Sequence, residues 1–306
     1  MTDPWLPMAT VKILYTADDP ESLPKLPFSA FRGALGAALR KISCVLKSRK
    51  SCLGCPLSNT CAYGYLFETP RPQNAEKLRG YPFIPHPFVF NIPYPLRGSA
   101  EFPVELTLVG RAIDFTPHII LALQLLGEKG LGKRRCKLTV KTITDGTTEK
   151  PLIQNGSIKT PSTIPEPILP ENPNTAEINF SSPTAMRYNR KYVSESQLEF
   201  HIIIRNLLRR ASSLSYFHAH RELNMDYKSL ISKAEKVQTT EKQLKTISIK
   251  RFSSRKKMQY HMKGFIGKAT FAGDISPFAK LLILGSYIHI GKFTSFGFGQ
   301  YRVNFR

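Results

Sequence analysis

The fold is decided near the end of the chain, where the sequence reads Leu281-Leu282-Ile283-Leu284-Gly285-Ser286-Tyr287-Ile288-His289-Ile290, then Gly291-Lys292-Phe293-Thr294-Ser295-Phe296-Gly297-Phe298-Gly299, then Gln300-Tyr301-Arg302-Val303-Asn304-Phe305. The apolar run ahead of Gly291 predicts a buried helix, and Ser276-Pro277 suits its start as N-cap and first-turn residue. The alternation of apolar and polar residues after Gly299 predicts a strand. A glycine-rich loop, 291–299, therefore joins a buried helix to the last strand.

This loop combines glycine with basic and hydroxyl residues. Glycine lets backbone N–H groups approach an anion closely, and lysine, threonine and serine add charge and hydrogen bonds to phosphate. The loop lacks the GK[ST] arrangement of a nucleotide-binding P-loop, which disfavours a nucleoside triphosphate site. A tight connection is the commoner use of such a loop, so its context matters. The candidate phosphate-binding residues are Gly291, Lys292, Thr294, Ser295, Gly297 and Gly299.

The order of apolar helix, glycine-rich basic loop and strand occurs twice in the chain. It appears first at 117–126, 127–135 and 137–141, and we interpret the two copies as a degenerate internal repeat. The prolines of residues 157–175 predict an extended linker between the halves. The sequence thus predicts an α+β protein of two tandem ferredoxin-like (RRM-like, βαββαβ) domains, residues 1–156 and 176–306.

The elements of each predicted domain follow from local periodicity. Strands are expected at 9–15, 82–95, 102–109 and 137–141 in the first domain, and at 176–180, 246–252, 258–271 and 300–305 in the second. The first helix is expected to start at Ser29. The long helix of the second domain is expected at 196–218, with Arg205, Arg209 and Arg210 in solvent. The polar residues 226–243 are expected to form a helical or mobile insertion.

The charge of the chain favours a polyanionic partner. There are 44 Lys and Arg residues against 22 Asp and Glu, a net charge of +22 over 306 residues. Residues 185–306 hold 23 basic and 7 acidic residues, so +16 of this excess lies in the final 122 residues. Nucleic acid is favoured over a merely solubilising surface. No apolar run approaches about 18 residues and no signal-like N-terminus is present, so a cytoplasmic protein that does not enter a membrane is expected.

Four cysteines cluster after the first predicted helix. Cys44, Cys52, Cys55 and Cys61 follow a C-x7-C-x2-C-x5-C pattern, whereas Cys136 stands apart. In an intracellular chain such thiols suit a tetrahedral metal better than disulfides, and the Cys52-x-x-Cys55 step aims two sulfurs at one ion. A structural zinc is expected in this insertion, 44–61. An iron–sulfur cluster uses the same four thiolates, and four unligated cysteines are the remaining alternative.

Several segments resemble a known family. The stretch Gly264-Phe265-Ile266-Gly267-Lys268-Ala269-Thr270-Phe271 and the motif His289-Ile290-Gly291-Lys292-x-Thr294-x-Phe296-Gly297-x-Gly299 resemble the C-terminal domain of prokaryotic CRISPR repeat-RNA-processing endoribonucleases. The stretch Phe31-Arg32-Gly33-Ala34-Leu35-Gly36 and the cysteine cluster ending Cys61-Ala62-Tyr63-Gly64-x-Leu66-Phe67 resemble the N-terminal part of one branch. These enzymes form part of the repeat-associated RNA-binding (RAMP) superfamily, and the resemblance spans most of the chain.

The resemblance implies two ferredoxin-like domains and metal-independent cleavage within the CRISPR repeat. A 2′-hydroxyl attacks the adjacent phosphorus and leaves a 2′,3′-cyclic phosphate (or a 3′-phosphate) and a 5′-hydroxyl. This reaction uses a general base, a general acid and a cation, and it uses no cofactor. The implied partners are the CRISPR repeat RNA, the crRNA made from it, and other subunits of a CRISPR effector complex.

The catalytic residues are harder to assign, because many relatives carry a histidine near the first helix and the first histidine here is His86. The resemblance favours His289, which matches the family motif and would shuttle a proton. His218, at the end of the long helix, is the second choice. Lys41 and Arg32 lie on the first predicted helix, where relatives place catalytic groups, and either would supply the cation. A capping or core role for His289 is the alternative.

RNA contacts are also predicted where basic residues fall in turns outside the glycine-rich loop. The residues are Arg255, Lys256 and Lys257 at the tip of a hairpin, and Arg187, Arg190 and Lys191 after the first strand of the second domain. A basic hairpin fits the base of an RNA stem, where the major groove is narrow and phosphates crowd.

Two other functions stay open on the sequence. The first is a non-catalytic crRNA-binding subunit of an effector complex, which the missing early histidine favours. The second is a zinc-bearing DNA-binding regulator, which fits the charge and the cysteines. The regulator explains neither the repeated helix, loop and strand nor the match at 264–271.

Overall fold

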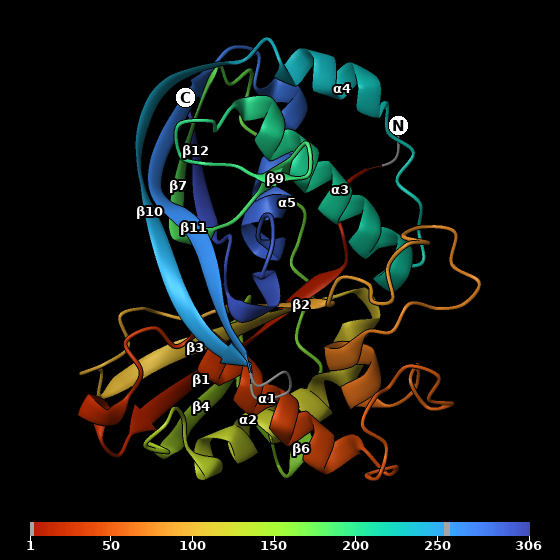
Figure 1. The fold of residues 1–306 in the computed structure, drawn as a ribbon, viewed down its shortest axis with the longest axis vertical. Coiled ribbons are helices and arrows are strands. Elements are labelled where there is room, and N and C mark those ends of the chain that lie inside the picture. The colour runs from red at the N-terminus through yellow and green to blue at the C-terminus, as the bar shows by residue number, and fades with distance from the viewer. Residues whose placement is uncertain (1–2, 254–257) are drawn as a thin grey trace. The chain divides into compact units, whose positions relative to one another are not determined.

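The computed structural model describes residues 3–253 and 258–306, which form two compact units (Figure 1). The N-terminal unit comprises Pro7–Ile164 together with Phe217–His220. The C-terminal unit comprises Met1–Leu6, Pro165–Tyr216 and Arg221–Arg306. The main division, at Ile164/Pro165, falls within the proline-rich segment predicted as a linker.

The N-terminal unit is a four-stranded antiparallel sheet covered by two helices. The strands are β1 (Met8–Ala17), β2 (Phe88–Asn91), β3 (Glu101–Val109) and β4 (Leu138–Asp145), in the spatial order β2-β3-β1-β4. The helices are α1 (Phe28–Ser43) and α2 (Thr116–Lys129). This βαββαβ order with β1 and β3 in the centre is the ferredoxin-like arrangement. Shorter elements are η1 (Pro20–Ser22), η2 (Tyr63–Glu68), η3 (Gly110–Phe115), β5 (Ile153–Gln154) and β6 (Ser157–Ile158).

The core of this unit forms because every second residue of β1 faces the helices. Val11, Ile13 and Tyr15 are fully buried, as a period of two predicts for a strand with one covered face. The Tyr15 hydroxyl donates to the Leu123 carbonyl of α2 at 2.9 Å, so its one polar atom is satisfied inside the core.

The C-terminal unit repeats the same topology. Its strands are β7 (Thr175–Thr184), β10 (Gln238–Ser253), β11 (Met258–Ala272) and β12 (Tyr301–Phe305), in the order β10-β11-β7-β12. Figure 1 shows α3 (Phe200–His218) and α5 (Ala279–Ile288) on the same side of this sheet. Both units are therefore ferredoxin-like, as the repeat in the sequence predicted. The remaining elements are β8 (Arg187–Tyr188), β9 (Lys191–Tyr192), α4 (Tyr227–Ala234), η4 (Ser276–Phe278) and η5 (Thr294–Phe296).

Glycine at position 285 sets how closely α5 lies on the last strand. A Cβ on Gly285 would lie 2.1 Å from the Tyr301 hydroxyl. That hydroxyl donates to the Leu282 carbonyl at 2.6 Å, and Tyr301 is 1% exposed. The glycine-rich loop that follows α5 is therefore attached to a helix held rigidly against the sheet.

Several predicted boundaries were wrong: β2 covers only Phe88–Asn91 of the strand expected at 82–95, and α3 begins at Phe200 and not at 196. Ser29 lies inside α1, which begins at Phe28, and Ser276 opens the short turn η4 before α5. β10 begins at Gln238, so part of the predicted insertion is strand and only α4 is helical. Most β10 side chains from Thr240 to Lys245 are exposed, and an edge strand of this kind shows no apolar alternation in the sequence. Among the described residues, no helix is long and apolar enough to cross a bilayer.

Candidate nucleic-acid interface

His289 closes the glycine-rich loop. It follows the last residue of α5 with a φ of 58°, and its Nδ1 lies 3.0 Å from the Phe298 carbonyl at the other end of the loop. The side chain is 2% exposed. Burial, and then the Arg210 guanidinium, lower the pKa of His289 to about 3. The ring is therefore neutral near pH 7 and its Nδ1–H donates to Phe298.

The backbone of the loop is already hydrogen-bonded to the protein. Ile290 N–H donates to the Gly299 carbonyl at 2.9 Å, and Lys292 N–H donates to the Ala185 carbonyl at 2.7 Å. Gly299 has a φ of 76°, and a Cβ there would lie 1.9 Å from the Ile290 carbonyl oxygen, so only glycine fits. The glycines thus serve first to close the loop tightly.

The loop residues predicted to bind RNA differ in accessibility. Gly291 and Lys292 are partly exposed. Thr294 and Ser295, which are 7% and 4% exposed, lie in η5 and face inward, and Gly297 and Gly299 are buried as well. RNA contact by the four buried residues stays a prediction, and the side chain that the loop presents is Lys292.

Four basic side chains converge beside the loop, and we refer to Lys292, Arg187, Arg209 and Arg210 as the loop cluster. The pKa of Lys292 is lowered first by burial and then by the charges of Arg209, Arg187 and Arg210. No salt bridge between described residues includes any of the four. Like charges held together without a carboxylate raise the free energy of the folded protein unless an anion binds.

Arg210 is the most constrained member of the cluster. Its Nε donates to the Ile288 carbonyl of α5 at 2.7 Å. Part of the side chain reaches the surface, but its Nη2 is buried and has no hydrogen-bond partner among the described residues. Burial lowers the pKa of Arg210 to about 9. The expectation that Arg210 is solvated was therefore wrong, because its guanidinium packs beneath the end of α5.

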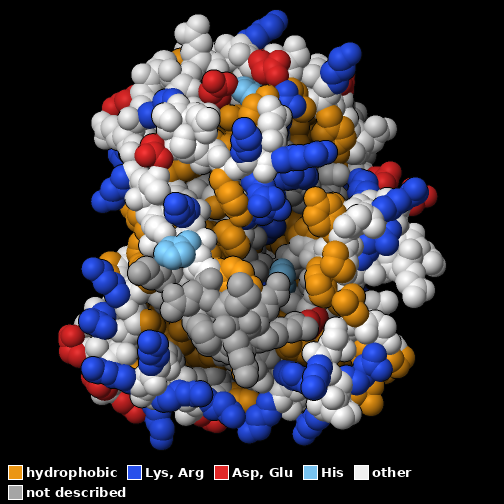
Figure 2. Space-filling model, in the orientation of Figure 1, with side chains coloured by type: hydrophobic (Ala, Val, Ile, Leu, Met, Phe, Trp, Pro, Cys, Tyr) orange, Lys and Arg blue, Asp and Glu red, His pale blue; other side chains and the backbone are white. Residues whose placement is uncertain are grey.

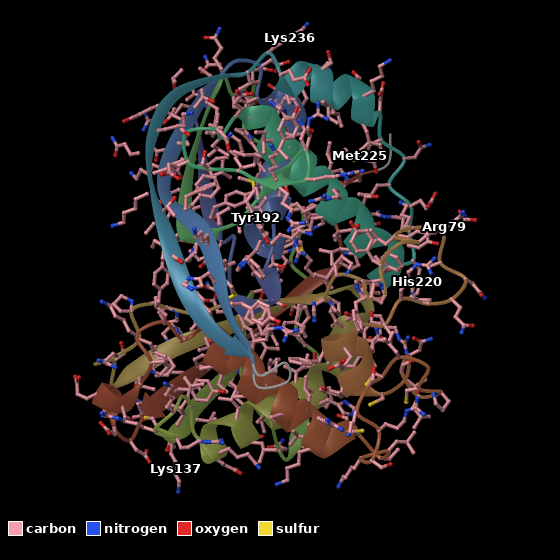
Figure 3. The ribbon with its side chains drawn as sticks, in the orientation of Figure 1. Arg79, Lys137, Tyr192, His220, Met225 and Lys236 are labelled. Carbon is pink, nitrogen blue, oxygen red and sulfur yellow. The ribbon has the colours of Figure 1, made fainter. Side chains whose placement is uncertain are left out.

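The hairpin β8–β9 lies beside the loop, because Ala185 and Lys292 form a β-bridge. Arg187 stacks over the ring of Tyr192 at 4.5 Å, and Tyr192, labelled in Figure 3, is 49% exposed. The turn of the hairpin is Asn189-Arg190, with φ angles of 47° and 64°. Arg190 and Lys191 are exposed at this turn. The structure thus brings predicted residues of the hairpin and the loop together.

Basic side chains gather on the face of the C-terminal unit that Figure 2 shows. Figure 2 shows Lys and Arg side chains gathered over α3 and β9. The predicted contacts Arg255, Lys256 and Lys257 lie outside the described residues. Among the described residues, the candidate RNA-binding surface therefore consists of the loop cluster and the β8–β9 hairpin.

His218, the second predicted catalytic residue, is buried in the N-terminal unit. It is 1% exposed. Its Nδ1 lies 3.0 Å from the Tyr65 hydroxyl, and its Nε2 lies 2.8 Å from the Pro85 carbonyl. Because a carbonyl only accepts, Nε2 carries the hydrogen and Nδ1 accepts from the tyrosine. These contacts fix the orientation of the ring. The catalytic role of His218 stays a prediction.

The structure brings a different histidine to α1. His86 Nε2 lies 2.8 Å from Arg32 Nη2 and 2.9 Å from the Phe67 carbonyl oxygen. The Arg32 guanidinium also stacks over the Phe67 ring at 4.2 Å. Both His86 and Arg32 are partly exposed. Nε2 therefore has a partner in either state, since it donates to the carbonyl when protonated and accepts from Arg32 when not.

Lys41 and the four clustered cysteines lie at and beyond the C-terminal end of α1. Lys41 is exposed in the last turn of the helix. The cysteines Cys44, Cys52, Cys55 and Cys61 are all partly exposed and line two adjoining pockets. Burial, and then the Glu68 carboxylate, raise the pKa of the Cys52 thiol to about 11, and the other three thiols add to the effect. The predicted cluster is thus spatially contiguous.

Sequence reasoning missed Arg210 and His86 for different reasons. Arg210 lies three residues after Leu207 and four before Leu214, both fully buried, so the helical phase of α3 already placed it on the buried side. The partners His86 and Arg32 are 54 residues apart and meet only because the chain before β2 folds back onto α1. No spacing in the sequence could have indicated that pair.

Comparison with known proteins finds family models that match parts of both units. Residues 6–175, more than half of the chain, match a family model described as an N-terminal domain, and the chain belongs to that domain family. Residues 178–301 match the family model described as CRISPR-associated endoribonuclease Cas6. Most of the C-terminal unit is thus similar to a Cas6 domain. The loop cluster and the glycine-rich loop both lie within the Cas6 match.

Solved Cas6 structures share the whole fold of the chain. Thermus thermophilus Cas6 superposes with a TM-score of 0.59 at 15% identity, covering 98% of this chain and 99% of that one. A product complex of the same Cas6 gives a TM-score of 0.58 at 16% identity, covering 98% and 100%. A partial Cas6-RT-Cas1–Cas2 complex gives 0.56 at 12% identity, covering 99% of this chain and 46% of that one. At these identities the likeness establishes the fold.

A relative found by sequence matches a smaller part of this chain than the solved structures do. An uncharacterized protein of Archaeoglobus fulgidus is 28% identical over 130 residues, which is 42% of this chain. The match spans 43% of that protein's length.

Proposed function

We propose that this chain binds CRISPR repeat RNA and cleaves it within the repeat by a metal-independent transesterification. The observation that carries the proposal is the loop cluster within the stretch that matches Cas6. Its four basic side chains gather beside the glycine-rich loop, and none of them forms a salt bridge with another described residue. An RNA phosphate would relieve that repulsion and supply the acceptor that the buried Arg210 Nη2 lacks.

The neighbouring hairpin supports RNA over a free anion. Tyr192 presents an exposed ring backed by Arg187, and exposed aromatic rings next to cations are the usual platform for unstacked bases. Together, Lys292 and Tyr192 suit single-stranded RNA, because Lys292 would bind a phosphate of the RNA backbone while Tyr192 stacks against an unpaired base.

The cleavage step is best supported on the N-terminal unit, by His86 and Arg32. In this reaction the 2′-hydroxyl loses its proton and its oxygen bonds to phosphorus, the P–O5′ bond breaks, and the 5′-oxygen gains a proton. His86 Nε2 lies within hydrogen-bonding distance of both a donor, Arg32, and an acceptor, the Phe67 carbonyl, so this nitrogen is suited to accept or donate the transferred proton. Arg32 supplies positive charge for the pentavalent phosphorane. Arg32, which the sequence offered beside Lys41 as a source of the cation, would take that role, and His86 would take the role predicted for His289 or His218.

The three catalytic residues predicted from the sequence are less well placed for this chemistry. His289 is buried with a strongly lowered pKa, and His218 is buried with both ring nitrogens hydrogen-bonded. Lys41 is exposed and remains a candidate cation. Their catalytic roles stay predictions that the same experiment tests.

A second function, a crRNA-binding subunit without catalysis, is favoured by the burial of His289 and His218. In that case the chain would hold processed RNA together with other CRISPR proteins. Cas6 occurs in a complex with RT-Cas1 and Cas2 among the similar structures, which supports a partner of this class. The regulator that binds DNA is disfavoured by the Cas6 match over residues 178–301.

Cleavage of a labelled repeat RNA in excess EDTA separates these functions. We expect a single cut that is abolished by one 2′-deoxy substitution at the cleavage site. His86→Ala should slow single-turnover cleavage by about 10²–10⁴-fold while RNA affinity is kept. His118→Ala is the matched control, because His118 is exposed on α2. Tight binding without cleavage under any condition would make the chain an RNA-holding subunit, and normal cleavage by His86→Ala would remove His86 from the mechanism.

A further inference from the structure

The segment that joins α1 to η2 has its cysteines turned inward and its apolar residues turned outward. Val45 is 74% exposed, and Leu53 and Leu57 are 44% and 39% exposed. The four cysteines of the same segment are all less accessible. A loop of this length normally needs either an apolar core or a covalent or metal crosslink to take one conformation. The exposed Val45, Leu53 and Leu57 do not provide an apolar core, so the four thiols are the candidates for a metal crosslink.

The backbone presents these thiols from three fixed points. Cys44 caps the C-terminus of α1 through its N–H to the Arg40 carbonyl at 3.1 Å, and Cys61 lies two residues before the start of η2 at Tyr63. Cys52 and Cys55 share a turn closed by the Cys55 N–H to the Cys52 carbonyl at 3.1 Å. Gly54 takes a φ of 67° within that turn, a conformation that suits glycine. A closed Cys-x-x-Cys turn directs both sulfurs to the same side.

All four thiols border adjoining pockets, and the surrounding charges suit an anionic metal complex. One pocket is lined by Cys44, Cys52 and Cys55, and the next by these three with Cys61. Arg40, Arg49 and Lys50 line the first pocket together with a single carboxylate, Glu68. A zinc ion held by four thiolates carries a net charge of about −2, which these cations would balance.

Arg40 also ties the loop to the helix. Its Nη2 donates to the Arg49 carbonyl at 2.7 Å and to the Lys47 carbonyl at 3.3 Å. The start of the loop is therefore held over the end of α1, on the side where Cys44 lies. As the described side chains stand, no three Cys, His, Asp or Glu groups are arranged to hold a metal ion. A staggered rotation about one χ1 angle moves a cysteine sulfur by about 3 Å, so metal binding requires the thiols to change rotamer.

We propose that Cys44, Cys52, Cys55 and Cys61 bind one structural zinc ion that fixes the 44–61 loop to α1 and η2. Four thiolates close the coordination shell, so the ion has no open position for water or substrate and its role is structural. Binding releases the thiol protons and brings the four sulfurs to about 2.3 Å from the metal. This site is independent of the proposed RNA cleavage, because neither His86 nor Arg32 is among its ligands.

Metal analysis of the purified full-length chain, grown with zinc and iron both available, tests the site. We expect about one zinc per chain in the wild type and loss of that zinc in Cys52→Ser/Cys55→Ser. Cys136→Ser is the control and should keep the metal. Cys136 is 4% exposed and its thiol lies 3.2 Å from the Asp19 carbonyl, a contact that a serine hydroxyl also makes. Absence of bound zinc from the wild type, or its retention in the double variant, would overturn the proposal.

Two measurements on the wild-type chain keep the test decisive where the double variant fails to fold. Titration of the zinc-stripped protein with cobalt(II) should give the visible bands of a tetrahedral thiolate complex together with a thiolate-to-metal charge-transfer band. Trypsin should cut after the exposed Lys47, Arg49 and Lys50 faster in chelator than in zinc. Cobalt spectra without thiolate bands, or cutting that ignores the metal, would refute the site. Iron with acid-labile sulfide in place of zinc would overturn the zinc assignment.

Discussion

Removal of one cation from the loop cluster should change RNA binding by an amount that the geometry fixes. Lys292, Arg187 and Arg209 each reach the surface, whereas the Arg210 Nη2 is buried. Each phosphate neutralised on a single strand contributes about 0.7 to the slope of log affinity against log salt. Three accessible cations therefore account for a slope of about 2.1, and Lys292→Met should lower the measured slope by about 0.7.

The affinity should fall as well. A hydrogen bond between a lysine and a phosphate contributes about 1.5 kcal/mol where it is partly shielded from solvent, which corresponds to about a tenfold loss at low salt. Fluorescence anisotropy of a labelled repeat RNA, repeated over a series of potassium chloride concentrations, measures both quantities. The tenfold loss should shrink as salt rises, because the wild type loses counterion release faster than the variant.

Lys268→Met is the matched control. Lys268 lies in β11 of the same unit, is exposed, and is already paired with Glu177 at 3.8 Å, so its charge adds little to the field around the loop. An unchanged slope in Lys292→Met, or an equal fall in Lys268→Met, would show that RNA is held by net charge alone and that the loop cluster is not its site.

Two further predictions concern stability without RNA. Lys292→Met should raise the melting temperature, because Arg209, Arg187 and Arg210 disfavour the charge on Lys292; calorimetry in RNA-free buffer that showed a loss of stability would contradict the repulsion. The second prediction concerns His289, whose pKa is lowered from 6.5 to about 3 in the folded chain. As the pH falls below about 6.5, His289 therefore binds a proton in the unfolded chain and stays unprotonated in the folded chain. This difference should lower the free energy of unfolding by roughly 2 kcal/mol between about pH 6.5 and 5. Urea titrations should show a shallower pH dependence of that free energy in His289→Gln than in the wild type. The same pH dependence in both proteins would refute the burial of His289.

The repeated fold could be predicted because its signals are local. The apolar helix, glycine-rich loop and alternating strand at 276–305 each depend on residues within a few positions of one another. Two copies of the same order then indicated two ferredoxin-like units, and both sheets have the corresponding strand order. The prediction was weaker where a strand lies at the exposed edge, as at the start of β10, because no buried face imposes a period of two on its side chains.

The tertiary structure alone decided which charged and titratable groups meet. The sequence supplied the basic excess of residues 185–306 and the candidates Arg187 and Lys292. The folded chain brought them together through the bridge between Ala185 and Lys292, and it buried the Arg210 guanidinium beside them.

The histidines show the same division between sequence and structure. Their positions were known from the sequence, but their chemistry depends on burial and on partners far along the chain. In the folded chain, the neutral His289 ring is hydrogen-bonded to the Phe298 carbonyl and closes the loop, whereas His86 lies at hydrogen-bonding distance from Arg32 on α1. Propensity and charge are properties of short stretches and of composition, whereas desolvation and pairing depend on contacts that only the packed fold creates.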